Sequence, residues 1–203
     1  MIVNIKTDFK EILDSIKKLQ PDIRDRVMKP ALRLTANNAK VALVREIAQN
    51  YNLDRTSINQ GVAVKVFDQP LSTSSGVRFD AVIITSHPRQ SYNLIRFLEK
   101  SISLAAHRRR KKAGDSQLRA RISKRGSYKP LGKNVFIGNN GRTVFMVPKS
   151  EMSKPSSQRK IRAFSTINLP MMSRVASVAD TVMSRINEQL PKNINSQLER
   201  LLK

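Results

Sequence analysis

The sequence has no cysteine and no tryptophan, and only 5% of its residues are aromatic. Without cysteine, the chain can form no disulfide, no thiolate nucleophile and no cysteine-ligated zinc site. The few aromatics predict a modest core built from aliphatic side chains. No apolar run approaches the roughly 20 residues that span a membrane, and the N-terminus lacks the apolar core of a secretory signal. We therefore expect a soluble protein that is used without export and has no membrane partner.

Acidic residues are also scarce. Only 15 Asp and Glu stand against 38 Lys and Arg, which gives a formal net charge of +23 over 203 residues. A positive excess of this size favours a polyanionic neighbour, such as nucleic acid, an acidic protein surface or an anionic membrane. The length suits one sizeable domain or two small ones.

The residue constellations of common enzymes are missing as well. The 7 glycines are scattered and form no phosphate-binding loop. His87 and His107 stand in unrelated contexts, which does not predict a metal site. Asp80 has no second carboxylate at a spacing that suits acid–base chemistry, and a metal-dependent nuclease needs a carboxylate cluster that Asp80 alone does not make. We expect no enzyme, no cofactor and no bound metal.

The most regular pattern in the chain predicts one long amphipathic helix over Asp22–Asn50. Because Pro30 lacks an amide hydrogen, we expect its regular part to begin near Lys29. A shorter helix is predicted within Met1–Gln20. The apolar stripe of the long helix recurs at steps of four or three residues: Met28, Leu32, Ala36, Ala39, Leu43 and Ile47. Such a stripe needs a sheet or further helices to cover it.

Two strands and a hairpin are predicted downstream. Val62–Phe67 and Arg78–Ser86 have β-rich patterns and should pair antiparallel, with the second strand buried on both faces. Between them, residues 68–76 are expected to form a loop. Ser91–Leu104 remains open between a helix and an irregular edge segment. Asn139-Asn140-Gly141 is typical of a hairpin turn, because Asn and Gly accept positive φ angles.

The C-terminal part reads as a polar linker over 151–169, followed by helices over 170–203 that break at Pro191. We therefore predict an α+β fold, with a long N-terminal helix packed on a mainly antiparallel sheet and an α+β core over 1–150. One apolar stripe of the C-terminal segment is a candidate assembly interface: Met171, Val175, Val178 and Val182.

A basic insertion over about 105–133 is the main candidate binding segment. Asp115 is the only carboxylate between His107 and Lys149, so like charges should keep the segment mobile unless a polyanion is present. A solvated loop that only aids solubility is the simpler interpretation, and a membrane contact is less favoured because no amphipathic basic helix accompanies the run. No aromatic residue interrupts the run before Tyr128, so we expect contact with nucleic-acid phosphates without sequence recognition. The candidate nucleic-acid-binding residues are Arg108, Arg109, Arg110, Lys111, Lys112, Arg119, Arg121, Lys124 and Arg125.

The order of these features resembles the minor tail protein Z family of tailed bacteriophages. The strand at Val62–Phe67, the central basic insertion, the hairpin over 135–147 and the helix after Leu169-Pro170 follow in the order that the family shows. The similarity covers most of the chain and lies in pattern and order. The residues at its opening are Ala31-Leu32-Arg33-Leu34-Thr35-Ala36, Lys40, Arg45-Glu46-Ile47, Leu53 and Ile58.

This resemblance implies a structural virion protein without catalytic residues. Members of the family complete the tail where it joins the DNA-filled head, and proteins at such joints commonly form rings, often six-fold. The implied partners are further copies of the chain, tail terminator and tail tube proteins, neck or connector proteins, and the end of the packaged DNA. The implied location is the head-proximal end of the tail, after assembly in the host cytoplasm.

A second interpretation follows from the charge alone. A nonspecific nucleic-acid-binding or packaging-assistance protein that is not part of the virion would have the same basic excess. Presence in, or absence from, the assembled particle distinguishes the two.

Overall fold

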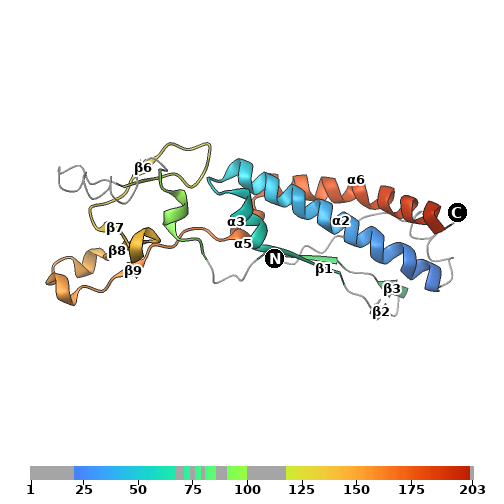
Figure 1. The fold of residues 1–203 in the computed structure, drawn as a ribbon, viewed down its shortest axis with the longest axis horizontal. Helices are drawn as coiled ribbons and strands as arrows, with labels where there is room; N and C mark the ends of the chain where they lie inside the picture. Colours follow the sequence, from blue (N-terminus) through green and yellow to red (C-terminus); the bar gives the residue numbers. More distant parts are fainter. Residues whose placement is uncertain are drawn as a thin grey trace. The chain divides into compact units, whose positions relative to one another are not determined.

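The computed structural model describes residues 21–66, 71–73, 76–78, 81–85, 91–99 and 118–201. The described elements mix helices with short antiparallel strands (Figure 1), which confirms the α+β class with its long N-terminal helix, antiparallel sheets and C-terminal helix. Packing divides the chain into two units that are interleaved in sequence. Unit 1 comprises residues 1–47, 55–87 and 169–203, and unit 2 comprises residues 48–54 and 88–168. The helix predicted within Met1–Gln20 lies outside the described residues.

Helix α2 (Pro21–Asn50) confirms the long N-terminal helix, but the expected start near Lys29 is wrong because the helix continues through Pro30. A proline inside a helix costs about 3 kcal/mol. Apolar residues on both sides of Pro30 offset this cost, since Val27 and Ala31 are fully buried in a cluster with Ile194. Each fully buried aliphatic side chain of valine size or larger contributes roughly 1.5–3 kcal/mol.

The C-terminal helices are α5 (Leu169–Ser173) and α6 (Ala176–Leu201). The predicted break at Pro191 is wrong, because α6 is continuous through that residue. Ile186 and Ile194, on either side of the proline, are each 1% exposed, so burial again holds the helix together across a residue that disfavours it.

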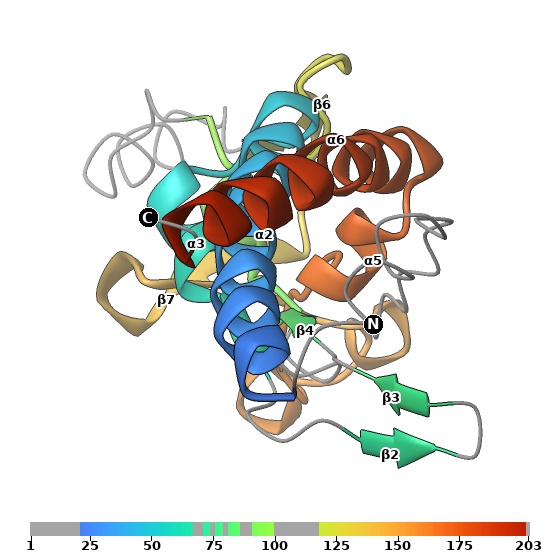
Figure 2. The same cartoon turned by 90° about the vertical axis from the view of Figure 1, so that its right-hand side faces the viewer.

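In unit 1, α6 lies beside α2 and runs antiparallel to it (Figures 1 and 2). The Asn193 side-chain amide donates to Oγ1 of Thr35 at 2.9 Å, and the Asn38 amide donates to Oε1 of Gln189 at 3.4 Å. These polar pairs sit beside the apolar contacts and fix which parts of the two helices face each other.

A two-stranded sheet in unit 1 pairs β1 (Val62–Val66) with β4 (Ala81–Thr85), which confirms the antiparallel arrangement. The expectation that the second strand is buried on both faces is wrong. Ile83 is 8% exposed, whereas Ile84 is 44% exposed. Only one face of this sheet is covered, and side chains alternate between faces along a strand.

Two short elements flank this sheet. Helix α3 (Arg55–Gln60) precedes it and buries Ile58. The predicted loop over 68–76 instead includes β2 (Leu71–Thr73) and the first residue of β3 (Gly76–Arg78), which pair as a small hairpin, drawn in Figure 2. Strands of three residues are too short to leave a periodic pattern in the sequence.

Unit 2 contains the predicted hairpin, formed by β7 (Val135–Gly138) and β8 (Thr143–Met146). Asn139, Asn140 and Gly141 have φ angles of 50°, 52° and 86°, which confirms the turn. A third strand, β9 (Arg162–Ala163), pairs with the other edge of β8.

Asn93 joins this sheet to the segment over 91–99. Its Oδ1 accepts from the backbone N–H of Val144 at 2.9 Å and from that of Ile95 at 3.0 Å, and its Nδ2 donates to the Val144 carbonyl at 3.1 Å. One amide side chain thereby pairs with a strand as a backbone would. The 3₁₀-helix η1 (Leu94–Phe97) follows Asn93, so the described part of the ambiguous segment is irregular and not α-helical.

Of the predicted linker over 151–169, residues 151–168 belong to unit 2 and Leu169 belongs to unit 1. Arg159 donates from Nε to the Lys154 carbonyl at 2.8 Å and from Nη2 to the Met152 carbonyl at 3.1 Å. Lys160 donates its backbone N–H to the Glu151 carboxylate at 3.2 Å. Polar composition predicts exposure but does not distinguish a linker from a loop closed by its own hydrogen bonds.

Candidate polyanion-binding surface

The structure describes four of the nine predicted nucleic-acid-binding residues, all on one hairpin of unit 2. Strands β5 (Arg119–Ala120) and β6 (Lys129–Pro130) pair antiparallel, and Ile122–Ser127 forms the loop between them. The five residues of the basic run lie outside the described residues: Arg108, Arg109, Arg110, Lys111 and Lys112.

Alternation along β5 explains which side chains reach solvent. Leu118 and Ala120 are 1% and 7% exposed, whereas Arg119 between them is exposed. The backbone N–H of Glu99 donates to the Arg119 carbonyl at 3.2 Å, and that of Arg121 donates to the Phe97 carbonyl at 2.9 Å. The strand is thus anchored by buried apolar residues and a neighbouring chain segment while it presents a cation outward.

The loop tip is tied to the last residue of α2 and to the residues that follow it. Lys124 donates its backbone N–H to the Asn50 carbonyl at 2.9 Å, and Asn52 donates to the Ile122 carbonyl at 2.8 Å. Ser123 makes the turn itself, since its carbonyl accepts from Gly126 at 3.2 Å and its hydroxyl accepts from the Arg125 backbone N–H at 3.3 Å. The backbone of this part of the insertion is thus held by specific hydrogen bonds.

Arg121 stacks on Tyr128 at the neck of this loop. The guanidinium carbon lies 4.7 Å from the ring centroid, within the range of a cation–π contact. The Nε–H of Arg121 is buried and has no hydrogen-bond partner among the described residues. Arg121 is thus half-buried, unlike the other three cations of the set, and Tyr128 is a contact that charge counting alone did not predict.

The exposed cations of the hairpin make no ion pair with any carboxylate in the described part of the chain. Lys129 and Lys133 share this property; both lie in the predicted basic insertion, although they were not among its nine candidate binding residues. Some cations elsewhere are paired, since Lys192 and Arg185 both contact Glu188 at 2.9 Å. Unpaired surface cations leave a positive potential that a polyanion relieves.

Two carboxylates in contact with Lys or Arg, one in each unit, have lowered pKa values. Hydrogen bonds from Lys154 and from the Lys160 backbone lower the pKa of Glu151, and hydrogen bonds from Lys192 and Arg185 lower the pKa of Glu188. Burial raises the pKa of Tyr92 and of Tyr51. None of these groups lies on the β5–β6 hairpin.

The four predicted assembly residues divide into two pairs. Val178 and Val182 are 0% and 4% exposed and belong to the core of unit 1, so they are not surface residues of this chain. Met171 and Val175 are 57% and 40% exposed and remain available for contact with another molecule. The four residues do not share one helix as the sequence predicts, because Met171 lies in α5, Val175 lies between α5 and α6, and Val178 and Val182 lie in α6.

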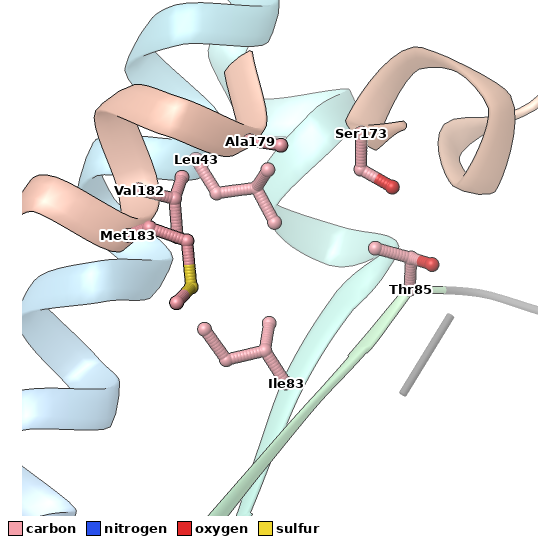
Figure 3. A pocket seen from close by; sticks show the side chains of 7 residues that line it. All are labelled: Leu43, Ile83, Thr85, Ser173, Ala179, Val182 and Met183. Atoms are coloured by element: carbon pink, nitrogen blue, oxygen red, sulfur yellow. The ribbon is translucent and has the colours of Figure 1, made fainter. Parts of the chain in front are cut away.

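A small apolar pocket lies in unit 1 among α2, β4, α5 and α6 (Figure 3). Thr85 lines it and is buried, and its hydroxyl has no hydrogen-bond partner among the described residues. The neighbouring Ser173 hydroxyl donates to the Pro170 carbonyl at 3.0 Å. The other lining residues are apolar: Leu43, Ile83, Ala179, Val182 and Met183.

Within the described part of the chain, no group of His, Asp or Glu residues is placed to hold a metal ion. Among those residues, too, no helix is long and apolar enough to cross a membrane. The positions considered from sequence for metal or acid–base chemistry, Asp80, His87 and His107, lie outside the described residues.

Comparison of the chain with protein-family models, with curated proteins and with solved structures found no match.

Proposed function

We propose that this chain is a structural tail-completion protein of a long-tailed bacteriophage. It joins the tail to the DNA-filled head through ring-like contacts between copies and neighbours, and it contacts the end of the packaged DNA without reading its sequence. Unit 1 supplies the packed scaffold in this proposal, and unit 2 supplies the cationic surface.

The observation that carries the proposal is the β5–β6 hairpin. Arg119, Lys124, Arg125 and Lys129 are exposed on it without carboxylate partners among the described residues. Hydrogen bonds to Asn50 and Asn52 fix the loop that carries two of them. Cations of this kind release condensed counterions when they meet phosphates, which gives strong, salt-dependent and sequence-independent binding.

Contacts between copies are assigned to Met171 and Val175, the exposed pair of the predicted assembly residues. A ring needs a heterologous interface, in which one patch meets a different patch on the next copy. Removing exposed apolar side chains from water at such a contact lowers the free energy and so stabilises it. Tail terminator, tail tube and neck or connector proteins are the further partners in this proposal.

Localisation tests the proposal. Mass spectrometry of purified phage particles should detect the protein, and immunogold labelling should place it at the head-proximal end of the tail. Absence from purified particles would contradict the proposal and favour a nucleic-acid-binding or packaging-assistance protein that acts before the virion is complete.

A further inference from the structure

The Ile122–Ser127 loop has a defined backbone conformation although it carries adjacent cations. The backbone N–H groups of Lys124, Arg125 and Gly126 all have acceptors within 3.3 Å, and the Ile122 carbonyl accepts from Asn52. Dense like charge opposes a fixed loop, so specific contacts must hold it in place.

The side chains that flank this loop make one such contact. Arg121 immediately precedes the loop and Tyr128 immediately follows it, and they stack at 4.7 Å. Behind them, the Leu131 backbone N–H donates to the Leu118 carbonyl at 2.6 Å and closes the base of the hairpin. The stack therefore joins the two ends of the loop that carries Lys124 and Arg125.

We infer that Tyr128 is a positioning residue, which holds Arg121 and thereby presents Lys124 and Arg125 to the backbone phosphates of duplex DNA. This inference rests on the proposed DNA contact and deepens it. A loop already fixed in its binding conformation loses less conformational entropy on association than a mobile one. Tyr128 thus contributes to affinity although its own ring carries no charge.

The composition of the loop favours phosphate over a protein surface as its ligand. Its exposed side chains are Ile122, Ser123, Lys124, Arg125 and Ser127. Protein–protein interfaces are enriched in aromatic residues and depleted in Lys and Ser. The loop itself offers no aromatic ring for base stacking, so contact with the duplex backbone is the mode that its donors suit.

Binding of the full-length protein to two labelled DNA duplexes of unrelated sequence, measured over a series of salt concentrations, tests this inference. Lys124→Ala with Arg125→Ala should reduce the slope of log K against log salt by about 1.8, the loss of two phosphate contacts. Tyr128→Leu should weaken binding about 3- to 10-fold with the slope nearly unchanged, because every charge remains. Tyr128→Phe keeps an aromatic face for Arg121 and should bind like the wild type.

Hydrogen exchange of the free protein gives a second readout. The Lys124 and Gly126 amides should be protected in the wild type and in Tyr128→Phe, and should exchange faster in Tyr128→Leu. Equal DNA affinity of Tyr128→Leu and wild type, or equal weakening by Tyr128→Phe, would overturn the positioning role alone. Failure of the wild type to bind either duplex would overturn the proposed DNA contact and this inference together.

Discussion

The two units differ in how charge and apolar burial are distributed. Unit 2 has 20 Lys and Arg against 4 Asp and Glu in 88 residues, for a net charge of +16, whereas unit 1 has 18 against 11 in 115 residues, for +7. Of the buried apolar residues in the described ranges, 17 belong to unit 1 and 8 to unit 2. The smaller unit therefore carries most of the net positive charge and the smaller share of the buried apolar residues.

This difference indicates that the two units are stabilised by different interactions. Unit 1 is stabilised mainly by apolar packing of α2, α6 and the β1–β4 sheet, which is insensitive to salt. Unit 2 relies more on specific hydrogen bonds, such as those of Asn93 and the loop tip, because self-repulsion among its cations works against a compact state. Such a unit gains stability when a polyanion neutralises it.

The largest effect should come from the charge of unit 2. Changing Arg108, Arg109, Arg110, Lys111 and Lys112 to Ala should lower DNA affinity by about two to four powers of ten at low salt and flatten the salt dependence, because up to five phosphate contacts are lost. Titrations of duplex DNA at several salt concentrations measure both quantities.

A matched control removes the same number of charges from unit 1. Changing a set of its cations to Ala should leave the salt slope nearly unchanged: Arg33, Lys40, Arg55, Arg174 and Arg200. Equal losses from the two sets would show that total charge, and not unit 2, determines binding.

The apolar core of unit 1 should give the next largest effect. Ile186 is 1% exposed on α6, so Ile186→Ala should lower the free energy of unfolding by about 2–5 kcal/mol through lost burial and a new cavity. Urea denaturation followed by helical circular dichroism measures the loss. Leu201→Ala on the same helix, at a residue 42% exposed, should cost far less. A similar cost for the two variants would contradict the assignment of unit 1 as the packed scaffold.

A single side chain should matter comparably in unit 2. Asn93→Ala removes three hydrogen bonds and leaves the backbone N–H of Val144, a buried residue, without its acceptor, at a cost of about 1–3 kcal/mol. Hydrogen exchange of the β8 amides should report the loosened sheet. Asn134→Ala, which removes one bond to the Val147 carbonyl, is the milder control. If β8 protection is unchanged in Asn93→Ala, the polar account of unit 2 is wrong.

The smallest effect concerns pH. Contacts with Lys154 and Lys160 lower the pKa of Glu151, so its ionised form stabilises the folded state. This contribution is complete above the ordinary Glu pKa and disappears as pH falls through the lowered folded value. Glu151→Gln should therefore reduce thermal stability slightly at neutral pH and match the wild type in acid. A difference between the two proteins that grows toward acid pH would have the wrong sign.

Some elements could be predicted from sequence because local rules and tertiary packing agree. The stripe of α2 and the Asn139-Asn140-Gly141 turn are such cases. The continuity of α2 and α6 through Pro30 and Pro191 was not predictable from sequence. Proline disfavours a helix interior, and only the tertiary structure shows that burial of the neighbouring residues outweighs this preference. The one-sided burial of β4 depends on how many layers cover the sheet, which strand composition does not encode.

In the candidate site, too, the features that depend on tertiary contacts could not be predicted from sequence. Charge counting identified Arg119, Lys124 and Arg125, but it did not separate them from the half-buried Arg121. That separation depends on the stack with Tyr128, and the loop's support at Asn50 and Asn52 comes from a segment about seventy residues earlier. Likewise, the assembly stripe is periodic in sequence, and only packing shows that Val178 and Val182 are interior.

The salt dependence of DNA binding by the wild-type protein tests the central claim most directly. We expect equal affinity for duplexes of unrelated sequence and a steep negative slope of log K against log salt, of about −5 or steeper. A flat slope, or a strong preference for one sequence, would contradict the claim that unit 2 is a cationic surface for the phosphate backbone.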